Sequence, residues 1–315
     1  MVNKKKPFLV LCPMAGLTDS PFRQLCREWG ADRVYSEMIS VDALFYKFKK
    51  NEEFYRFQPA ERPVVLQLFG HKPKLFFEAT KKLAESAYRP DGFDINFGCP
   101  AKKVVHTGNG VALMRKPELA REIVAATILA ADNVPVSIKI RAGNGDMTAL
   151  KFLESLADLS WKTVMIHGRT YEQGFAGKAD WSLAKQIKKV YPDKEVIVNG
   201  GIMTPEDAYA AWQESEADGL GLGQGIIGKP WLFAQIKDYF ETKKYADLNL
   251  EQIKTVARYH LQALVEDKGE SSIITLRKHL AWYFKGFPGA AQWRDKLVRV
   301  STVKEVLDVL DGMND

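Results

Sequence analysis

The chain has 315 residues, of which 46% are hydrophobic and 27% are charged, and its formal net charge is +6 at pH 7. This composition is typical of a folded globular protein and excludes an intrinsically disordered chain. The positive charge is compatible with a polyanionic partner but does not require one. No stretch approaches the roughly 18 consecutive apolar residues of a membrane-spanning helix, and no signal peptide precedes the first apolar run, so we expect a cytoplasmic protein without a membrane partner.

The cysteines exclude two further classes of protein. Cys12, Cys26 and Cys99 are odd in number and lack the spacing of zinc ligands. A disulfide framework needs paired cysteines, and a structural zinc site needs closely spaced ligands. We therefore expect neither disulfides nor a bound metal.

Eight apolar, strand-like runs follow one another along the chain, with helical patterns between them. They lie at residues 8–10, 34–35, 64–68, 93–96, 136–140, 164–167, 196–199 and 219–222. Their spacing averages about 30 residues, which is typical of a strand, a loop and a crossover helix. Eight such units predict an α/β fold, a (β/α)8 TIM barrel, over residues 1–245. A doubly wound sheet is the competing fold, but residues 12–16 lack the G-x-G-x-x-G fingerprint expected after its first strand.

Two helix starts support this count of units. Ser20 and Thr204 each offer an N-cap hydroxyl, and each is followed by a proline, Pro21 or Pro205, at the first helical position. Both features are common at helix N-termini.

The pattern changes near Leu248 to amphipathic helices. Leu250, Ile253 and Val256, followed by further leucines, recur at helical spacing, which predicts a small all-helical C-terminal domain over residues 246–315.

Basic and aromatic residues alternate within that domain. Lys278, Trp282 and Lys285 are four and then three residues apart, so they share one side of a helix, where cations could meet phosphates and an aromatic ring could stack on a base. The alternative is that the aromatic side chains belong to the core and the cations face solvent.

Polar residues end four of the apolar runs. Gln67, Lys139, His167 and Asn199 each lie at or near the carboxyl end of a predicted strand. Burying one such group without a partner costs about 1–3 kcal/mol. A bound polar ligand at the carboxyl end of the barrel would supply a shared partner.

Glycine-rich turns follow the last two predicted strands. Asn199-Gly200-Gly201 comes after the seventh run, and Gly221 to Gly225 after the eighth. Loops at these two places form the usual phosphate site of a barrel. A planar ligand with a phosphate, such as flavin mononucleotide (FMN), would place its ring against Gln67 and Lys139, where the lysine stabilises the reduced, anionic flavin.

Cys99 lies in the segment Asn96-Phe97-Gly98-Cys99-Pro100. Proline restricts the residue before it and glycine permits close approach of the backbone, which predicts a stiff loop that presents the thiol. The thiol is either a small buried hydrophobe or a proton donor, because ordinary thiols have a pKa of about 8.5 and are protonated at neutral pH. Asp94 and Glu37 stay open as alternative acids.

Taken together, these motifs resemble the tRNA-dihydrouridine synthase family over essentially the whole chain. The motifs that carry the resemblance are Pro13-Met14-Ala15-Gly16, Gln67-Leu68-Phe69-Gly70, Asn96-Phe97-Gly98-Cys99-Pro100, Lys139-Ile140-Arg141, His167-Gly168-Arg169-Thr170, Asn199-Gly200-Gly201 and Arg277-Lys278-His279. The resemblance implies an FMN-bearing TIM barrel that uses NADPH to reduce the C5–C6 bond of selected uridines in tRNA. It implies no protein partner.

The resemblance also implies roles for individual residues. Cys99 would protonate uracil C5 after hydride arrives at C6. The implied cofactor contacts are Pro13, Met14, Ala15, Gln67, Lys139, His167, Asn199, Gly200, Gly201, Gly223 and Gln224. The implied substrate and tRNA contacts are Asn96, Lys102, Lys103, Arg141, Arg169, Arg277, Lys278, His279, Trp282 and Lys285.

The chain departs from the family pattern at two positions. Gln224 stands where the family often has an arginine that meets the flavin phosphate, so we expect weaker flavin retention. Cys12 replaces a common alanine before Pro13-Met14, which we interpret as a tolerated exchange of small residues.

Two other functions stay open from the sequence. A dihydroorotate or dihydropyrimidine dehydrogenase would act on a free pyrimidine but would not need a basic helical domain. A tRNA-binding or folding factor would keep that domain but not Cys99 beside a full set of flavin contacts.

Overall fold

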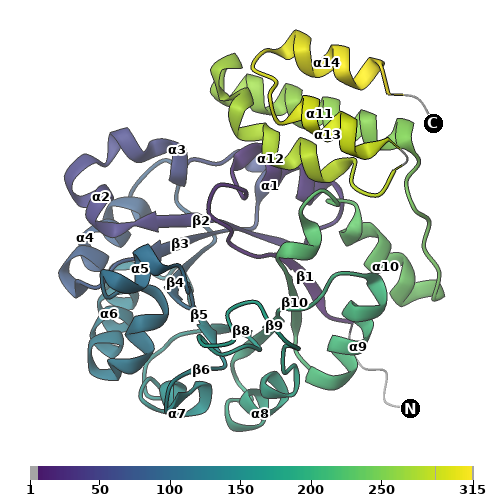
Figure 1. Cartoon of the computed structure of the whole chain (residues 1–315). Coiled ribbons are helices and arrows are strands. Elements are labelled where there is room, and N and C mark those ends of the chain that lie inside the picture. The colour runs from purple at the N-terminus through teal and green to yellow at the C-terminus, as the bar shows by residue number, and fades with distance from the viewer. Residues whose placement is uncertain (1–5, 288, 314–315) are drawn as a thin grey trace.

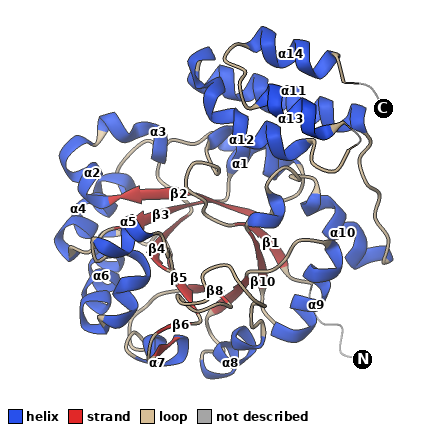
Figure 2. Ribbon diagram, viewed as in Figure 1, coloured by secondary structure: helices blue, strands red, loops and turns tan. Residues whose placement is uncertain are grey.

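The computed structural model describes residues 6–287 and 289–313. Among these residues, eight parallel strands close into a barrel in the order β1, β10, β9, β8, β5, β4, β3, β2 (Figures 1 and 2). The strands are β1 (Phe8–Leu11), β2 (Arg33–Ser40), β3 (Val64–Phe69), β4 (Gly92–Phe97), β5 (Val136–Arg141), β8 (Thr163–His167), β9 (Glu195–Asn199) and β10 (Gly219–Leu222). This confirms the predicted (β/α)8 fold. A short hairpin of β6 (Gly143–Asn144) and β7 (Met147–Thr148) lies in the loop after β5.

Helices surround the barrel on its outside (Figure 2). They are α1 (Ser20–Glu28), α2 (Val41–Lys47), α3 (Glu52–Tyr55), α4 (Pro73–Ala84), α5 (Lys102–His106), α6 (Pro117–Ala130), α7 (Ala149–Glu154), α8 (Ser182–Val190), α9 (Pro205–Ser215) and α10 (Leu232–Thr242). Thr204 caps α9 as predicted, in a capping box with Asp207. The predicted cap at Ser20 was wrong by one residue, because the Asp19 carboxylate accepts the hydrogen bond from Phe22 N and Ser20 begins the helix.

The remaining helices pack together beside α1 (Figure 1). They are α11 (Leu250–Lys268), α12 (Ile273–Tyr283), α13 (Ala290–Leu297) and α14 (Val303–Asp311). Asn249 caps α11 in a capping box with Gln252, and the apolar residues at helical spacing, such as Leu250 and Ile253, are buried. This confirms the helical C-terminal region, whereas the exact division at residue 246 stays a prediction. Within the described residues, no helix has both the length and the apolar character needed to cross a bilayer.

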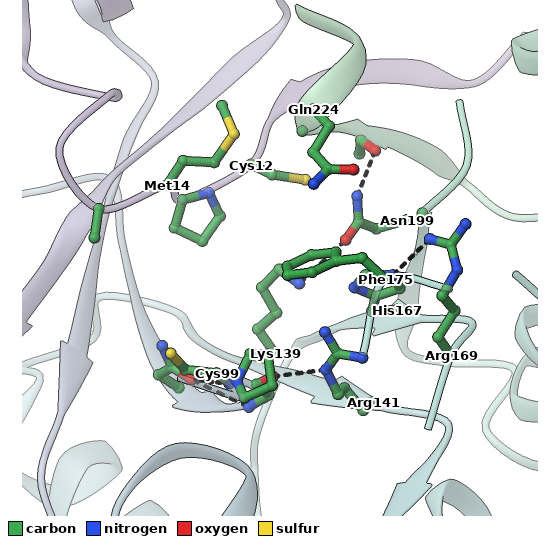
Figure 3. Close-up of a pocket in the computed structure, with 18 of the residues that line it drawn as sticks. Cys12, Met14, Cys99, Lys139, Arg141, His167, Arg169, Phe175, Asn199 and Gln224 are labelled. Atoms are coloured by element: carbon green, nitrogen blue, oxygen red, sulfur yellow. Dashed lines mark hydrogen bonds between the residues drawn. The ribbon is translucent and has the colours of Figure 1, made fainter. Parts of the chain in front are cut away.

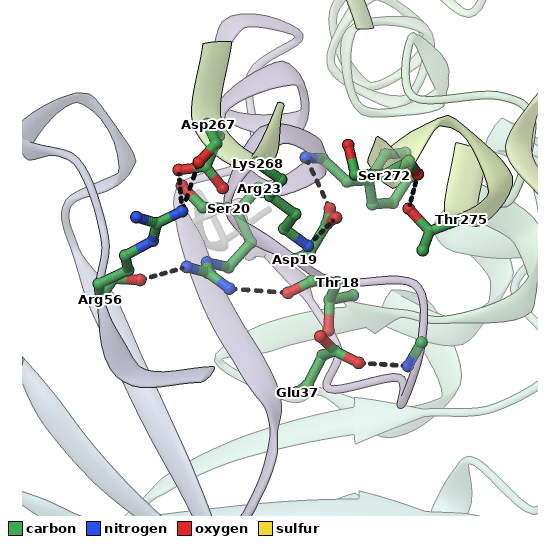
Figure 4. Close-up of polar contacts among 12 residues, drawn as sticks. Thr18, Asp19, Ser20, Arg23, Glu37, Arg56, Asp267, Lys268, Ser272 and Thr275 are labelled. Atoms are coloured by element: carbon green, nitrogen blue, oxygen red, sulfur yellow. Dashed lines mark hydrogen bonds and ion pairs between the residues drawn. The ribbon is translucent and has the colours of Figure 1, made fainter. Parts of the chain in front are cut away.

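Ion pairs join the end of α11 to the barrel (Figure 4). Lys268 Nζ lies 2.7 Å from the carboxylate of Asp19, and Arg56 Nη2 lies 2.9 Å from that of Asp267. The buried Arg23 donates to the main-chain oxygen of Arg56 as well as to that of Thr18. The loop that follows β1 is therefore held between the barrel and the helical region.

The barrel interior changes from apolar to polar along its axis. A separate cluster of buried side chains fills the amino-terminal part, and its members are Val10, Cys12, Tyr35, Val65, Met165 and Ile197. Side chains two residues apart on a strand share a face, so Gln67, His167 and Asn199 face inward above Val65, Met165 and Ile197. The apolar cluster closes the barrel below these polar groups, which face the carboxyl ends of the strands.

Candidate active site

A cavity of about 790 Å³ opens at the carboxyl ends of the strands (Figure 3). This volume lies within the usual range of small-molecule sites. The cavity brings together most of the predicted site residues, namely Pro13, Met14, Ala15, Gln67, Asn96, Cys99, Lys102, Lys139, Arg141, His167, Arg169, Asn199, Gly200, Gly201, Gly223 and Gln224. The predicted residues that do not line it are Lys103, Arg277, Lys278, His279, Trp282 and Lys285.

Cys99 lies on a loop held from both sides. The Asn96 side-chain oxygen accepts hydrogen bonds from Gly98 N at 3.1 Å and from Cys99 N at 2.9 Å. Behind the loop, a Cβ at Gly110 would lie 2.7 Å from the main-chain oxygen of Cys99, and Gly110 has φ +60°. The predicted stiff loop is present, because these contacts fix the main chain and leave the thiol partly exposed at the cavity wall.

The two alternative acids do not reach the cavity. Asp94 is fully buried and accepts hydrogen bonds from Gln67 and Ser137. Glu37 accepts a hydrogen bond from the main-chain N–H of Gly16. Of the three acids that the sequence left open, only Cys99 lines the cavity.

Lys139 extends from β5 into the cavity and donates to the Asn199 side-chain oxygen at 3.2 Å. Asn199 in turn donates to the main-chain oxygen of Gly221 at 2.8 Å. Burial lowers the pKa of Lys139, and the nearby thiol of Cys12 and carboxylate of Asp94 oppose that effect. An anionic ligand beside Lys139 would compensate the cost of this partly buried cation.

His167 is a neutral member of the site. Burial, together with the charges of Lys139, Arg141 and Arg169, lowers the pKa of His167 to about 2. Its Nε2 lies 3.3 Å from Nη1 of Arg169. Since arginine only donates hydrogen bonds, Nε2 acts as the acceptor and we infer that the ring carries its proton on Nδ1.

The two glycine-rich loops touch each other. A Cβ at Gly225, after β10, would lie 2.3 Å from the main-chain oxygen of Ile202, after β9. Gly200 has φ +106°, and a Cβ there would lie 2.6 Å from the ring of His167. Only glycine fits at both positions, and the close contact places the two loops of the predicted phosphate site on one wall.

Arg141 links two loops of the cavity wall. The residue is 1% exposed, and its guanidinium donates to the main-chain oxygens of Gly98, Thr170 and Gly174 at 2.7–3.0 Å. It therefore fixes the Cys99 loop relative to the loop after β8, in addition to lining the cavity.

Phe175 is a member of the cavity that the sequence reasoning missed. Its ring is 58% exposed and lies 5.5 Å from the Arg141 guanidinium and 6.3 Å from the His167 ring. Figure 3 shows it among the side chains that line the cavity. The available signal was an aromatic residue between two glycines, Gly174 and Gly177, in an otherwise polar segment.

Cys12 lines the bottom of the cavity, but we expect its thiol to be unreactive. It is 2% exposed, and its Sγ lies 3.5 Å from Sδ of Met165. Burial raises the pKa of Cys12 to about 12. The thiol stays protonated, which agrees with its interpretation as a tolerated small residue.

Two residues of the predicted RNA surface, His279 and Arg277, make contacts within the protein instead. His279 is 4% exposed, and its ring packs 4.4 Å from that of Phe22 and 4.8 Å from that of His260. His279 therefore does not lie on the surface. Arg277 donates to the main-chain oxygens of Val300 and Arg299, which gives it a structural role.

Trp282 and the two lysines stay on the surface. Trp282 is 47% exposed, and Nζ of Lys285, just beyond the end of α12, lies 4.6 Å from its ring. A Cβ at Gly16 would lie 2.9 Å from Nζ of Lys278, and one at Gly228 would lie 2.5 Å from Trp282. The face of α12 thus adjoins the loops after β1 and β10, beside the cavity.

The fold and the cavity define an enzyme of the barrel class with its polar site at the carboxyl ends of the strands. A family model described as dihydrouridine synthase matches residues 10–314. The chain belongs to the dihydrouridine synthase family. This confirms the resemblance, and with it the class of enzyme, a flavin-dependent oxidoreductase.

Individual relatives agree with this assignment. A protein of Synechocystis sp. named probable tRNA-dihydrouridine synthase 1 is 37% identical, covering 95% of this chain and 84% of the relative. The tRNA-dihydrouridine synthase B of Pseudomonas aeruginosa is 34% identical, covering 93% of this chain and 88% of the relative.

Two solved structures share the fold at low identity. TcOYE, solved with pHBA, has a TM-score of 0.53 at 11% identity, covering 82% of this chain and 93% of that one. Histamine dehydrogenase from Rhizobium sp. 4-9 has a TM-score of 0.57 at 13% identity, covering 98% of this chain and 62% of that one.

Proposed function

We propose that the protein is a tRNA-dihydrouridine synthase that reduces the C5–C6 bond of uridines in tRNA, with FMN as its flavin and NADPH as the electron source. One observation carries the proposal: Cys99, Lys139 and the two glycine loops all line a single cavity at the barrel mouth. The action on tRNA is consistent with the cytoplasmic location expected from the sequence.

The residues present fit FMN. The loops at Gly200 and Gly223 would hold the phosphate through main-chain N–H groups, as barrel loops after the last two strands commonly do. Gln67 and Lys139 would contact the polar edge of the ring, and Pro13 to Ala15 its apolar edge. The chemistry that FMN supplies when bound is hydride transfer.

Cys99 would supply the proton. Its thiol lies at the wall of the cavity, and its main chain is fixed by Asn96. The thiol would donate its proton to uracil C5 as hydride reaches C6, and solvent would return a proton to the sulfur after product leaves.

The uracil must leave its stack to enter the cavity. Flipping a base costs a few kcal/mol, and contacts between phosphates and cations would offset that cost. Lys278 and Trp282 on α12, and Lys285 just beyond its end, are exposed, and Lys278 and Trp282 adjoin loops beside the cavity. A free pyrimidine substrate would need none of them, which favours tRNA over the dehydrogenase alternatives.

Replacing both Lys278 and Lys285 with glutamate will weaken tRNA binding by about tenfold or more, because two attractions to phosphate become repulsions. The affinity is measured by filter binding with unmodified tRNA. Lys304, an exposed lysine on α14, is the matched control, and Lys304→Glu should bind tRNA as the native chain does. Equal affinity in the double variant and the native chain would assign the surface to solvent contact alone.

The purified protein will be yellow, and NADPH will bleach it under anaerobic conditions. Mass spectrometry of the released flavin identifies FMN, and NADH in place of NADPH tests the nucleotide preference. Incubation with NADPH and unmodified tRNA, followed by mapping of dihydrouridine along the tRNA, tests the reaction itself. A colourless protein that binds no added FMN would contradict the proposal.

A further inference from the structure

A chain of buried hydrogen bonds connects the barrel interior with the Cys99 loop. Asp94 on β4 is fully buried. It accepts from Ser137 Oγ at 2.6 Å and from Gln67 Nε2 at 2.7 Å, and these residues are its register partners on the neighbouring strands. Gln67 Oε1 accepts from Asn96 Nδ2 at 3.1 Å, and Asn96 Oδ1 accepts from the main-chain N–H of Cys99 at 2.9 Å.

The Asp94 carboxylate fixes which group donates and which group accepts in each of these hydrogen bonds. An ionised carboxylate only accepts hydrogen bonds, so Gln67 must turn its NH2 group toward Asp94 and its oxygen toward Asn96. Asn96 must then turn its NH2 group toward Gln67 and its oxygen toward the Cys99 loop. The loop presents N–H groups, which need that oxygen, so every amide along the chain has one satisfied orientation.

We propose that Asp94 is a positioning residue, which orients the amides of Gln67 and Asn96 and so holds the Cys99 thiol in its reactive place. The inference rests on the proposed function, since it assigns the role of one residue in that reaction. Asp94 touches neither the cavity nor the thiol, and it acts through two side chains that do line the cavity.

Protonation of Asp94 would remove the fixed donor and acceptor roles in these hydrogen bonds. A protonated carboxyl carries an O–H donor that can bond the Gln67 oxygen, so the amide chain can then reverse. Burial raises the pKa of Asp94 to about 6, while hydrogen bonds from Ser137 and Gln67 and the charge of Lys139 oppose the rise.

The ionisable neighbours of Asp94 come from β2, from β5 and from the residue that follows β1. Cys12, directly after β1, and Tyr35 of β2 have pKa values raised by burial and stay neutral, and Lys139 of β5 is the charged neighbour. His167, on the cavity wall, has a pKa of about 2 and does not titrate near pH 6. Ionisation of Asp94 therefore predicts an acid limb in kcat near pH 6.

Asp94→Asn tests the inference, because asparagine keeps the shape but can donate as well as accept. At pH 8 the holoenzyme variant should show a kcat for uridine reduction at least tenfold lower, with flavin content unchanged and a KM for tRNA within twofold of the native value. Its kcat should also lack the acid limb near pH 6. An unchanged kcat would overturn the inference.

Thermal stability separates positioning from a merely structural role. The folded-state pKa of Asp94, about 6, exceeds the ordinary 3.8, so the stability this group contributes is complete below pH 3.8 and is lost as the pH rises through 6. At pH 8 the native chain carries the cost of a buried charge, and Asp94→Asn should have a Tm at least as high. A lower Tm with flavin loss would assign Asp94 a structural role instead.

Ser137→Ala is the matched variant if Asp94→Asn does not fold. It removes one hydrogen bond that stabilises the ionised carboxylate and leaves the contact with Gln67. The acid limb of kcat should move to higher pH, with kcat at pH 9 within twofold of the native value. The inference would be overturned if the kcat of the native enzyme did not fall near pH 6, or if the kcat of Ser137→Ala fell at the same pH as that of the native enzyme.

Alkylation of Cys99 tests the positioning role of Asp94 independently of the proposed function. The rate of reaction with iodoacetamide, followed by peptide mapping, depends on the place of the thiol and not on uridine reduction. Asp94→Asn should change that rate by at least fivefold at pH 8. If native protein reduces no uridine, the proposed function fails, and an unchanged alkylation rate would overturn the positioning role separately.

Discussion

Cys99→Ala will keep its flavin and its affinity for tRNA, but its rate of uridine reduction will fall by about two to four orders of magnitude, the usual contribution of a general acid. The hydrogen bonds that fix this loop use the main-chain N–H groups of Gly98 and Cys99. Removal of the sulfur therefore leaves the loop in place and removes only the proton donor. The rate is measured as dihydrouridine formed in a single turnover with flavin reduced beforehand.

Cys26→Ala is the control for loss of a thiol. Cys26 is buried on α1, away from the cavity, and burial raises its pKa well above the ordinary value. This variant should reduce uridine at the native rate. Full activity in Cys99→Ala would remove the assigned role, and the search for the acid would return to the other groups at the cavity.

Lys139→Met will make the flavin harder to reduce. Methionine fills similar space without charge, so the anion of the reduced cofactor would lose the cation that we propose beside it. An opposite charge about 4 Å away in a partly buried site is worth about 4 kcal/mol at most. We expect a more negative midpoint potential and a rate of bleaching by NADPH that falls by about ten- to several-hundred-fold.

The potential is measured by anaerobic titration with a reference dye. Lys102→Met is the matched control, since Lys102 lies at the exposed rim of the same cavity and water screens its charge. The control should leave the midpoint potential unchanged. A native potential in Lys139→Met would show that this lysine does not stabilise the reduced flavin.

The barrel could be predicted from the sequence because its strands are apolar runs at regular spacing, and several of these runs lead to a polar residue. Val64 to Leu66 and Val196 to Val198 are buried in the structure, and the residues that follow them, Gln67 and Asn199, line the cavity. Position along a parallel strand determines which end of the barrel a side chain reaches. Most of the site followed from that rule together with the glycine turns.

The exposed face of α12 could be predicted less completely than the barrel. Helical spacing places Lys278, Trp282 and His279 on particular faces, but it does not show which face another element covers. Phe22, from α1, and His260, from α11, pack on His279. The contact with Phe22 joins segments more than 200 residues apart, and the contact with His260 joins two different helices, so no local pattern reports either of them.

The hydrogen-bond partners of Arg141 and Asp94 could not be predicted from the sequence either. Arg141 was expected to contact substrate, and most of its donors instead bind main-chain oxygens such as that of Gly174. Every residue carries such an oxygen, so the sequence gives no sign of which one is used. Asp94 was open as an acid, and its exclusion needed the burial and the contact with Gln67 that only the fold shows.

The ion pairs between α11 and the barrel differ from Lys278 and Lys285 in their sensitivity to ionic strength. Asp267 is 7% exposed at its side chain, and Asp19 and Lys268 are 14% and 20% exposed, so dissolved counterions screen them little. Lys278 and Lys285 face solvent and are screened strongly. We therefore expect raised electrolyte concentration to weaken any contact of Lys278 and Lys285 with phosphates more than it weakens the ion pairs that hold the helical region on the barrel.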